Sequence, residues 1–102
     1  MGDEVLPMNV RKALDIIYRT QGFTLEDLRK PDRHVRICNT RQWLAYFLFK
    51  ELGYTKREIG TFFNKDRSTA YAMIRQVESL LKSRDRMMRE IRKRFMDMWK
   101  SE

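Results

Sequence analysis

Glycine and proline, the residues that most readily interrupt helices, are scarce in this chain. Only four glycines and two prolines occur among the 102 residues, and both prolines lie in the first third. The sequence beyond residue 31 can therefore run as long helices with few breaks. Apolar residues make up 42% of the chain, which is enough for a hydrophobic core and argues against disorder. We expect one all-α domain over residues 1–102, a bundle of about five helices.

Capping residues and the spacing of apolar side chains predict where the helices lie. Thr24, with Asp27 three residues further on, has the spacing of a helix N-cap. Trp43, Tyr46 and Phe47 recur at helical spacing in the most apolar stretch, so we assign them to a buried central helix rather than to base stacking. Helical segments are expected at about residues 9–20, 24–28, 35–52, 55–62, 67–82 and 84–100.

The net charge of +8 is concentrated in two parts of the chain. Residues 1–30 are neutral, whereas residues 31–69 and residues 82–102 each carry eight basic side chains against four acidic ones. A basic domain of this size most often binds a polyanion, and nucleic acid is the most common one. The alternative is that the surplus charge only keeps the protein in solution.

Catalysis, metal binding and membrane insertion find little support in the sequence. Cys38 is the only cysteine and His34 the only histidine, which excludes an intrachain disulfide and a cysteine-based zinc site and removes most hydrolytic chemistry. No apolar run approaches the length of a membrane span, and the N-terminus lacks a signal-peptide pattern. We expect a cytoplasmic, nucleoid-associated protein that is not an enzyme, with no cofactor, metal, membrane or small-molecule substrate.

Residues 55–82 have the pattern of a helix-turn-helix. Thr55 and Glu58 have the spacing of a capping box that opens the first helix. Gly60 is small enough for a second helix to pack closely, and Asn64 tolerates the left-handed conformation of a turn. The residues expected to pack the two helices together are Ile59, Phe63, Ala70 and Met73. The alternative is an ordinary helical hairpin with a charged corner.

The start of the second helix presents polar side chains suited to DNA. Arg67 can pair with the O6 and N7 atoms of guanine, and Ser68 and Thr69 can bond a base or a phosphate. Asp66 is acidic, so we expect it to cap the helix rather than read DNA. The N-terminus of the helix itself favours a phosphate.

These residues resemble the C-terminal DNA-binding domain of DnaA, the bacterial replication initiator. The resemblance is carried by Glu58-Ile59-Gly60, by residues 63–69, and by Ile74-Arg75 with Val77-Glu78. Upstream, the same order is kept by Phe23, Asp27-Leu28, Arg33, Arg41-Gln42 and Lys50-Glu51-Leu52, so the likeness spans about residues 10–99. It implies a helix-turn-helix in an arrangement like that of the Trp repressor.

The resemblance also implies roles for individual residues. Arg33 matches the loop arginine that enters the minor groove, and Arg41 with Gln42 matches a pair that touches DNA backbone or bases. Arg36, in the same basic segment, is a further candidate contact. The residues that match those at the major groove are Asp66, Arg67, Ser68 and Thr69, preceded by the basic Lys65.

The chain departs from the DnaA pattern in several places. Arg67 stands where the family has a histidine that helps select bases, so we expect a different recognised sequence. The turn is one residue shorter and the helix from Arg41 to Lys50 one residue longer, which leaves the register of Arg41 open. No glycine-rich phosphate-binding loop is present, so we expect no ATP hydrolysis, and either a free-standing relative, as on phages or mobile elements, or an excised domain.

A basic stripe on the last helix has three interpretations. It is a solvated face, a surface that follows phosphates, or the outer side of a dimer helix whose seam is Met87, Ile91, Phe95 and Met98. The stripe consists of Arg84, Arg86, Arg89, Arg92, Lys93 and Arg94.

The sequence as a whole predicts a sequence-selective double-stranded DNA-binding protein that acts in replication initiation or its regulation. The alternatives are a transcriptional repressor and a non-catalytic interaction protein of phage or mobile-element type. In the latter case the methionine-rich last helix would bind a host protein.

Overall fold

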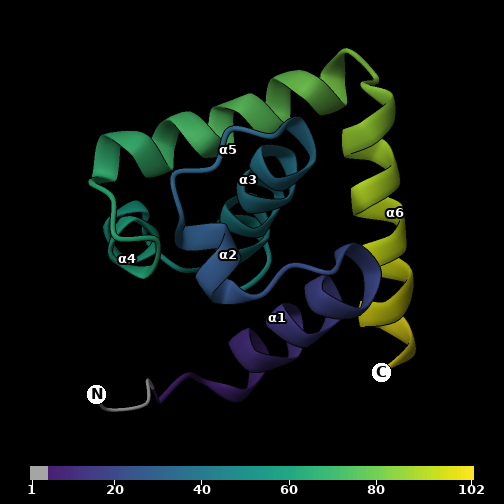
Figure 1. Ribbon diagram of the computed structural model, residues 1–102, viewed down its shortest axis with the longest axis horizontal. Helices are drawn as coiled ribbons and strands as arrows, with labels where there is room; N and C mark the ends of the chain where they lie inside the picture. The colour runs from purple at the N-terminus through teal and green to yellow at the C-terminus, as the bar shows by residue number, and fades with distance from the viewer. Residues whose placement is uncertain (1–4) are drawn as a thin grey trace.

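The computed structural model describes residues 5–102, and this part of the chain folds into helices joined by short connections (Figure 1). The helices are α1 (Met8–Gln21), α2 (Leu25–Arg29), α3 (Val35–Lys50), α4 (Lys56–Phe62), α5 (Arg67–Lys82) and α6 (Arg86–Ser101). The expected all-α class is confirmed, and the six helices of residues 5–102 lie at the six expected segments, one more than the expected bundle of about five.

Local chemistry sets the ends of these helices close to where the sequence predicted them. Gly22 ends α1 in the left-handed conformation, with φ 83. The central helix α3 ends at Lys50, two residues before the predicted end, because Gly53 is also left-handed, with φ 76. Tyr54 then turns back, and its N–H donates to the Leu48 carbonyl oxygen at 3.0 Å.

Helix α3 is the centre of the bundle and contacts all five other helices. Trp43 and Phe47 are buried as predicted, whereas Tyr46 is half-buried at the edge of the core. The Phe47 ring meets the ring of Phe95 from α6 edge to face, with 4.6 Å between centroids. Trp43 makes a similar contact with Phe95 at 5.7 Å. These aromatic contacts fix α6 against α3, and they leave Trp43 no free face for stacking on a base.

The apolar face of α6 packs within the same chain, which counts against the dimer seam, one of the three interpretations of the last helix. Ile91 and Phe95 are each only 1% exposed. Met87 and Met98 are half-buried. Figure 1 shows the cause: after α5 the chain turns back, so that α6 runs beside α3 and α1 and closes the bundle. Ile91 and Phe95 therefore cannot form the centre of an interface with a second copy through this face.

Candidate nucleic-acid interface

The turn between α4 and α5 depends on a close approach of two backbone segments. Lys65 N–H donates to the Gly60 carbonyl oxygen at 2.7 Å. A Cβ atom on Gly60 would lie 2.8 Å from the carbonyl oxygens of both Lys65 and Asp66, so no larger residue fits without moving backbone. Asn64 has φ 59, in the left-handed region that asparagine tolerates. Gly60 and Asn64 thus have the structural roles that the sequence predicted.

Hydrogen bonds from capping side chains fix where α4 and α5 begin. At α4, Glu58 N–H donates to Thr55 Oγ1 at 3.1 Å, and Thr55 N–H donates to Glu58 Oε1 at 2.8 Å. At α5, Thr69 N–H donates to Asp66 Oδ1 at 2.8 Å. This backbone bond, followed by one from the Thr69 side chain, lowers the pKa of the Asp66 carboxyl. Asp66 is therefore an ionised N-cap, as the residues predicted, and its contact with the major groove stays a prediction.

The predicted reading residues lie together at the N-terminal end of α5. Lys65, Asp66, Arg67 and Ser68 are exposed, and Thr69 is half-buried beneath them. The helix N-terminus adds a partial positive charge at the same place. The structure therefore presents one guanidinium, one ammonium and one hydroxyl group to solvent on a rigid, capped helix end.

Three further side chains extend this surface, Lys56 at the start of α4 and Tyr71 and Arg75 on α5. A depression of about 390 Å³ is lined by Lys56, Arg67, Ser68 and Tyr71. Lys56 Nζ lies 4.5 Å from the centroid of the Tyr71 ring, and Arg75 Nη1 donates to the Tyr71 hydroxyl oxygen at 2.6 Å. Lys56 and Arg75 were not among the residues predicted to contact DNA. Spacing could have pointed to Arg75, because it follows Arg67 by eight residues and Tyr71 by four on one helix face.

The basic loop between α2 and α3 is tied down by Arg41. Its guanidinium donates to the carbonyl oxygens of Leu28 at 2.6 Å, Lys30 at 2.9 Å and Asp32 at 3.3 Å. Arg33, in the same loop, has an exposed side chain. Arg41 thus holds in place the segment that carries Arg33. Direct contact of Arg41 with DNA stays a prediction.

The same loop starts beside the helix-turn-helix. Arg29, the last residue of α2, donates from Nε to the carbonyl oxygen of Phe62, the last residue of α4, at 2.7 Å. The Arg29 guanidinium also lies 5.2 Å from the centroid of the Phe62 ring. These contacts bring the base of the Arg33 loop and the end of α4 together, although they are 33 positions apart in the sequence.

Two other predicted residues are placed away from this cluster by their contacts. Arg36 donates to Gln21 Oε1 of α1 at 3.0 Å and lies 3.6 Å from Glu90 Oε1 of α6. Gln42 is half-buried, and its Oε1 atom is buried without a hydrogen-bond partner in the part of the chain that the structure describes. The structure gives neither residue a contact with the tip of α5, and their predicted contacts with DNA stay untested.

No group of three or more His, Cys, Asp or Glu side chains in residues 5–102 is placed to hold a metal ion. No helix in the same range is long and apolar enough to cross a membrane.

The sequence is similar to part of one protein of known name. No protein-family model matches the chain. The sequence is similar to the chromosomal replication initiator protein DnaA of Thermosipho melanesiensis, with 32% identical residues over 71 positions. These positions are 70% of this chain and 16% of that relative, so the chain corresponds to a small part of it.

Proposed function

Because the chain is homologous to part of the replication initiator DnaA, we propose that it is a sequence-selective, non-catalytic double-stranded DNA-binding protein acting in replication initiation or its regulation. The observation that carries this proposal is the exposed group of Lys65, Arg67 and Ser68 at the start of α5. A rigid turn and an N-cap hold these side chains at a helix end, the geometry with which helix-turn-helix proteins meet base edges in the major groove.

Arg67 is the residue proposed to read a base. Its guanidinium suits the paired O6 and N7 acceptors of guanine. Ser68 bonds a neighbouring base or a phosphate, and Lys65 with the helix N-terminus binds a phosphate. Asp66 stays bonded to the Thr69 N–H, so its negative charge is directed into the helix end rather than toward the DNA.

Lys56 and Arg75 are proposed to contact the sugar-phosphate backbone beside the bases that Arg67 reads. Tyr71 lies between them and contacts both, which limits the freedom of two otherwise flexible side chains. Such contacts fix the orientation of the protein on the duplex without selecting a sequence.

Arg33 is proposed to enter the adjacent minor groove, where a narrow groove attracts arginine. In this proposal Arg41 has a positioning role, since its guanidinium is already engaged by three carbonyl oxygens of the residues before Arg33. The conformational entropy that the loop loses on binding is then small, because Arg41 holds the loop in place before DNA binds.

Selection from a randomised duplex library, followed by sequencing, tests the proposal. We expect one enriched motif, and a slope of log K against log salt of about −5 to −7 if six to eight phosphates are neutralised. Arg67→Ala should cost about 1–3 kcal/mol and relax the preference at one base pair. Arg11→Ala is the matched control, since Arg11 is an exposed arginine on α1.

Other outcomes of this selection point elsewhere. Equal weakening of every sequence by Arg67→Ala contradicts base reading by that residue. Retention of DNA with no enriched motif contradicts sequence selectivity. No retention of DNA at all favours the alternative of an interaction protein.

A further inference from the structure

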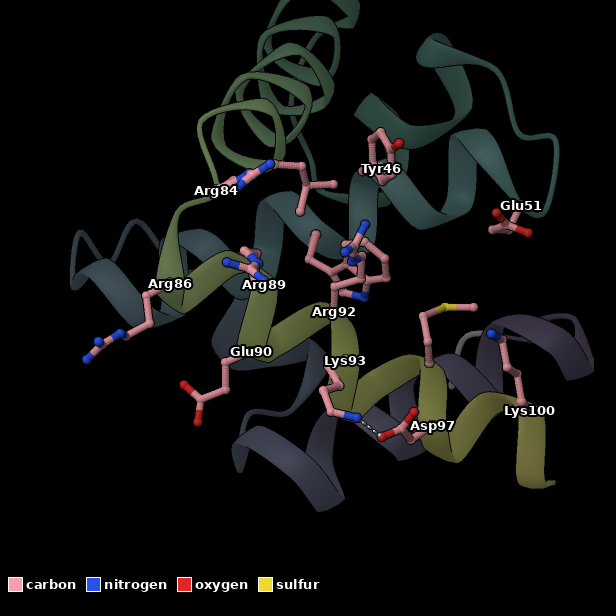
Figure 2. Close-up of a pocket in the computed structure, with 13 residues that line it drawn as sticks. Tyr46, Glu51, Arg84, Arg86, Arg89, Glu90, Arg92, Lys93, Asp97 and Lys100 are labelled. Atoms are coloured by element: carbon pink, nitrogen blue, oxygen red, sulfur yellow. Dashed lines mark hydrogen bonds and ion pairs between the residues drawn. The ribbon is translucent and has the colours of Figure 1, made fainter.

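A second basic surface lies at the opposite end of α5 from the reading residues. A groove of about 930 Å³ runs along α6 and is bordered by the α5–α6 turn and by α3 (Figure 2). Leu81 in the last turn of α5 lines it, whereas Ser68 in the first turn lines the depression at the reading end. At about 1.5 Å per residue, these two turns of α5 are about 20 Å apart.

The groove holds more positive charge than its own acidic residues neutralise. Its basic side chains are Arg84, Arg86, Arg89, Arg92, Lys93 and Lys100, and its acidic ones are Glu51, Glu90 and Asp97. Asp97 is paired with Lys93 at 3.1 Å, and Glu90 lies within 4 Å of two arginines, Arg36 and Arg94, that do not line the groove. In residues 5–102, the other five cations have no side-chain hydrogen bond or ion pair.

Arg84 is held in this groove at a conformational cost. It has φ 62, the left-handed region that an arginine rarely adopts and that glycine adopts freely. In Figure 2, Arg84 lies on the α5–α6 turn, and Arg89 and Arg92 extend from α6 toward the side of Tyr46, whereas Arg86 and Glu90 point to the outer side of α6. An arginine kept at a strained position, beside other unpaired arginines, indicates that its side chain is used.

We propose that this groove is a second binding site, for the phosphodiester backbone of another DNA segment. One molecule then holds two DNA segments, one read by α5 and one bound without regard to sequence. Unpaired guanidinium and ammonium groups are the donors that phosphates take. Trp43, which lines the groove, is only 2% exposed and offers a base no face to stack on, and Tyr46 beside it is half-buried. The exposed side chains of the groove are therefore charged groups, which suit the backbone rather than the bases.

The composition of the groove favours nucleic acid over an acidic protein as the partner. Protein interfaces have an apolar centre that buries aromatic anchors, and lysine is depleted there. Of the aromatic side chains of this groove, Trp43 is buried in the core and Tyr46 is half-buried at its edge, and every exposed lining residue is charged. The apolar face of α6 is also buried, so the helix has nothing to insert into a lipid surface.

A bridging assay with the whole chain tests this proposal. A biotinylated duplex on beads captures the protein, and a fluorescent duplex of unrelated sequence reports a second DNA segment. We expect the wild type to capture the fluorescent duplex, and Arg89→Gln/Arg92→Gln to lower that capture at least about tenfold. The slope of log K against log salt for the second duplex is negative, and its magnitude should decrease by about 0.9 for each lost phosphate contact. The charge-matched control is Arg11→Gln/Arg94→Gln, which removes two exposed arginines outside the groove.

Arg84→Gly separates binding from folding. Glycine removes the left-handed strain, so the midpoint of urea unfolding should rise while capture of the second duplex falls. Unchanged capture by the Arg89/Arg92 variant overturns the proposal, and so does equal loss in the Arg11/Arg94 control. Displacement of the second duplex by polyglutamate more readily than by free duplex overturns it in favour of an acidic protein.

The bridging proposal rests on the proposed function, because the captured duplex is held through α5, but the two can fail separately. Arg67→Ala/Ser68→Ala should lose sequence preference and still bind DNA through the groove. A selected motif without bridging refutes only the groove, and bridging without a motif refutes only the reading of bases by α5.

Discussion

Gly60 provides the sharpest test of how the helix-turn-helix is built, because alanine there has two opposite effects. In an unhindered helix position, alanine is better than glycine by about 1 kcal/mol. At Gly60 the new Cβ would lie 2.8 Å from two backbone carbonyl oxygens and 2.9 Å from the Asp66 carbonyl carbon. These atoms belong to the turn and cannot rotate away as a side chain does. Overpacking of this kind costs about 1–3 kcal/mol.

The displaced turn also weakens a hydrogen bond. The Lys65 N–H to Gly60 carbonyl bond is 2.7 Å long, and a bond of this type contributes about 1 kcal/mol. The cost therefore exceeds the gain, and Gly60→Ala should lower the free energy of unfolding by about 1–3 kcal/mol. For a domain of this size a change of about 2 kcal/mol lowers Tm by about 8–16 °C.

Thermal unfolding followed by circular dichroism measures this change, with Thr61 as the matched site. Thr61 is exposed in the same helix, so Thr61→Ala should be more stable than Thr61→Gly by about 1 kcal/mol. Gly60→Ala should have the opposite sign. A rise in Tm for Gly60→Ala similar to that at Thr61 would refute the argument that backbone contact requires glycine there.

Two further predictions concern the loop clamp and the cap. Arg41→Ala should remove most of the effect of Arg33→Ala on DNA affinity in a double-mutant cycle, and lysine at 41 should not restore it, since an ammonium lacks the planar fork. Additive effects would instead place Arg41 on the DNA. Asp66→Ala should lower the urea midpoint at neutral pH, whereas Asp66→Asn keeps a capping oxygen. Because the folded-state pKa is lowered from 3.8, the advantage of wild type over Asp66→Ala is full above 3.8 and declines as pH falls through the lower folded-state pKa. A constant difference down to the most acid condition would show that the ionised form is not the one that caps α5.

The helices and the turn could be predicted from the sequence because their causes are local. The capping boxes, the left-handed Gly22 and the left-handed Asn64 each involve residues within about four positions of one another. The role of Gly60 was predictable for a related reason, since a helix-turn-helix of this length always brings the first helix against the turn. The amphipathic pattern of α6 was also local and correct.

The sequence could not predict which part of the protein packs against the apolar face of α6. The packing of α6 depends on contacts between the two ends of the chain, such as the bond from Lys12 Nζ to the Trp99 carbonyl oxygen at 3.2 Å. Arg19 and Glu102 form another link at 2.7 Å. Periodicity says that a face is apolar and gives no information on whether its cover is the same chain or another one.

The sequence also could not predict the hydrogen-bond partners of the basic side chains. Arg41 and Arg33 are both arginines of one basic segment, yet one holds backbone carbonyls and the other is exposed. The resemblance to the DnaA domain predicted a DNA contact for both arginines. Their difference arises from the packing of α2 against α3, which places three carbonyl oxygens within hydrogen-bond distance of Arg41.

The basic residues are proposed to read a base, to contact a phosphate or to position another residue, and each of these roles needs its own measurement. Loss of affinity alone cannot map the interface, because we expect both Arg41→Ala and Arg67→Ala to weaken binding, the first by releasing the loop and the second by removing the proposed base contact. A base-reading residue changes the preferred sequence, whereas a phosphate contact changes the salt slope and leaves the sequence preference intact. A positioning residue loses its effect once the residue that it holds is removed. The three readouts together would therefore distinguish the tasks proposed for Arg67, Arg92 and Arg41, although the net charge of +8 counts these residues alike.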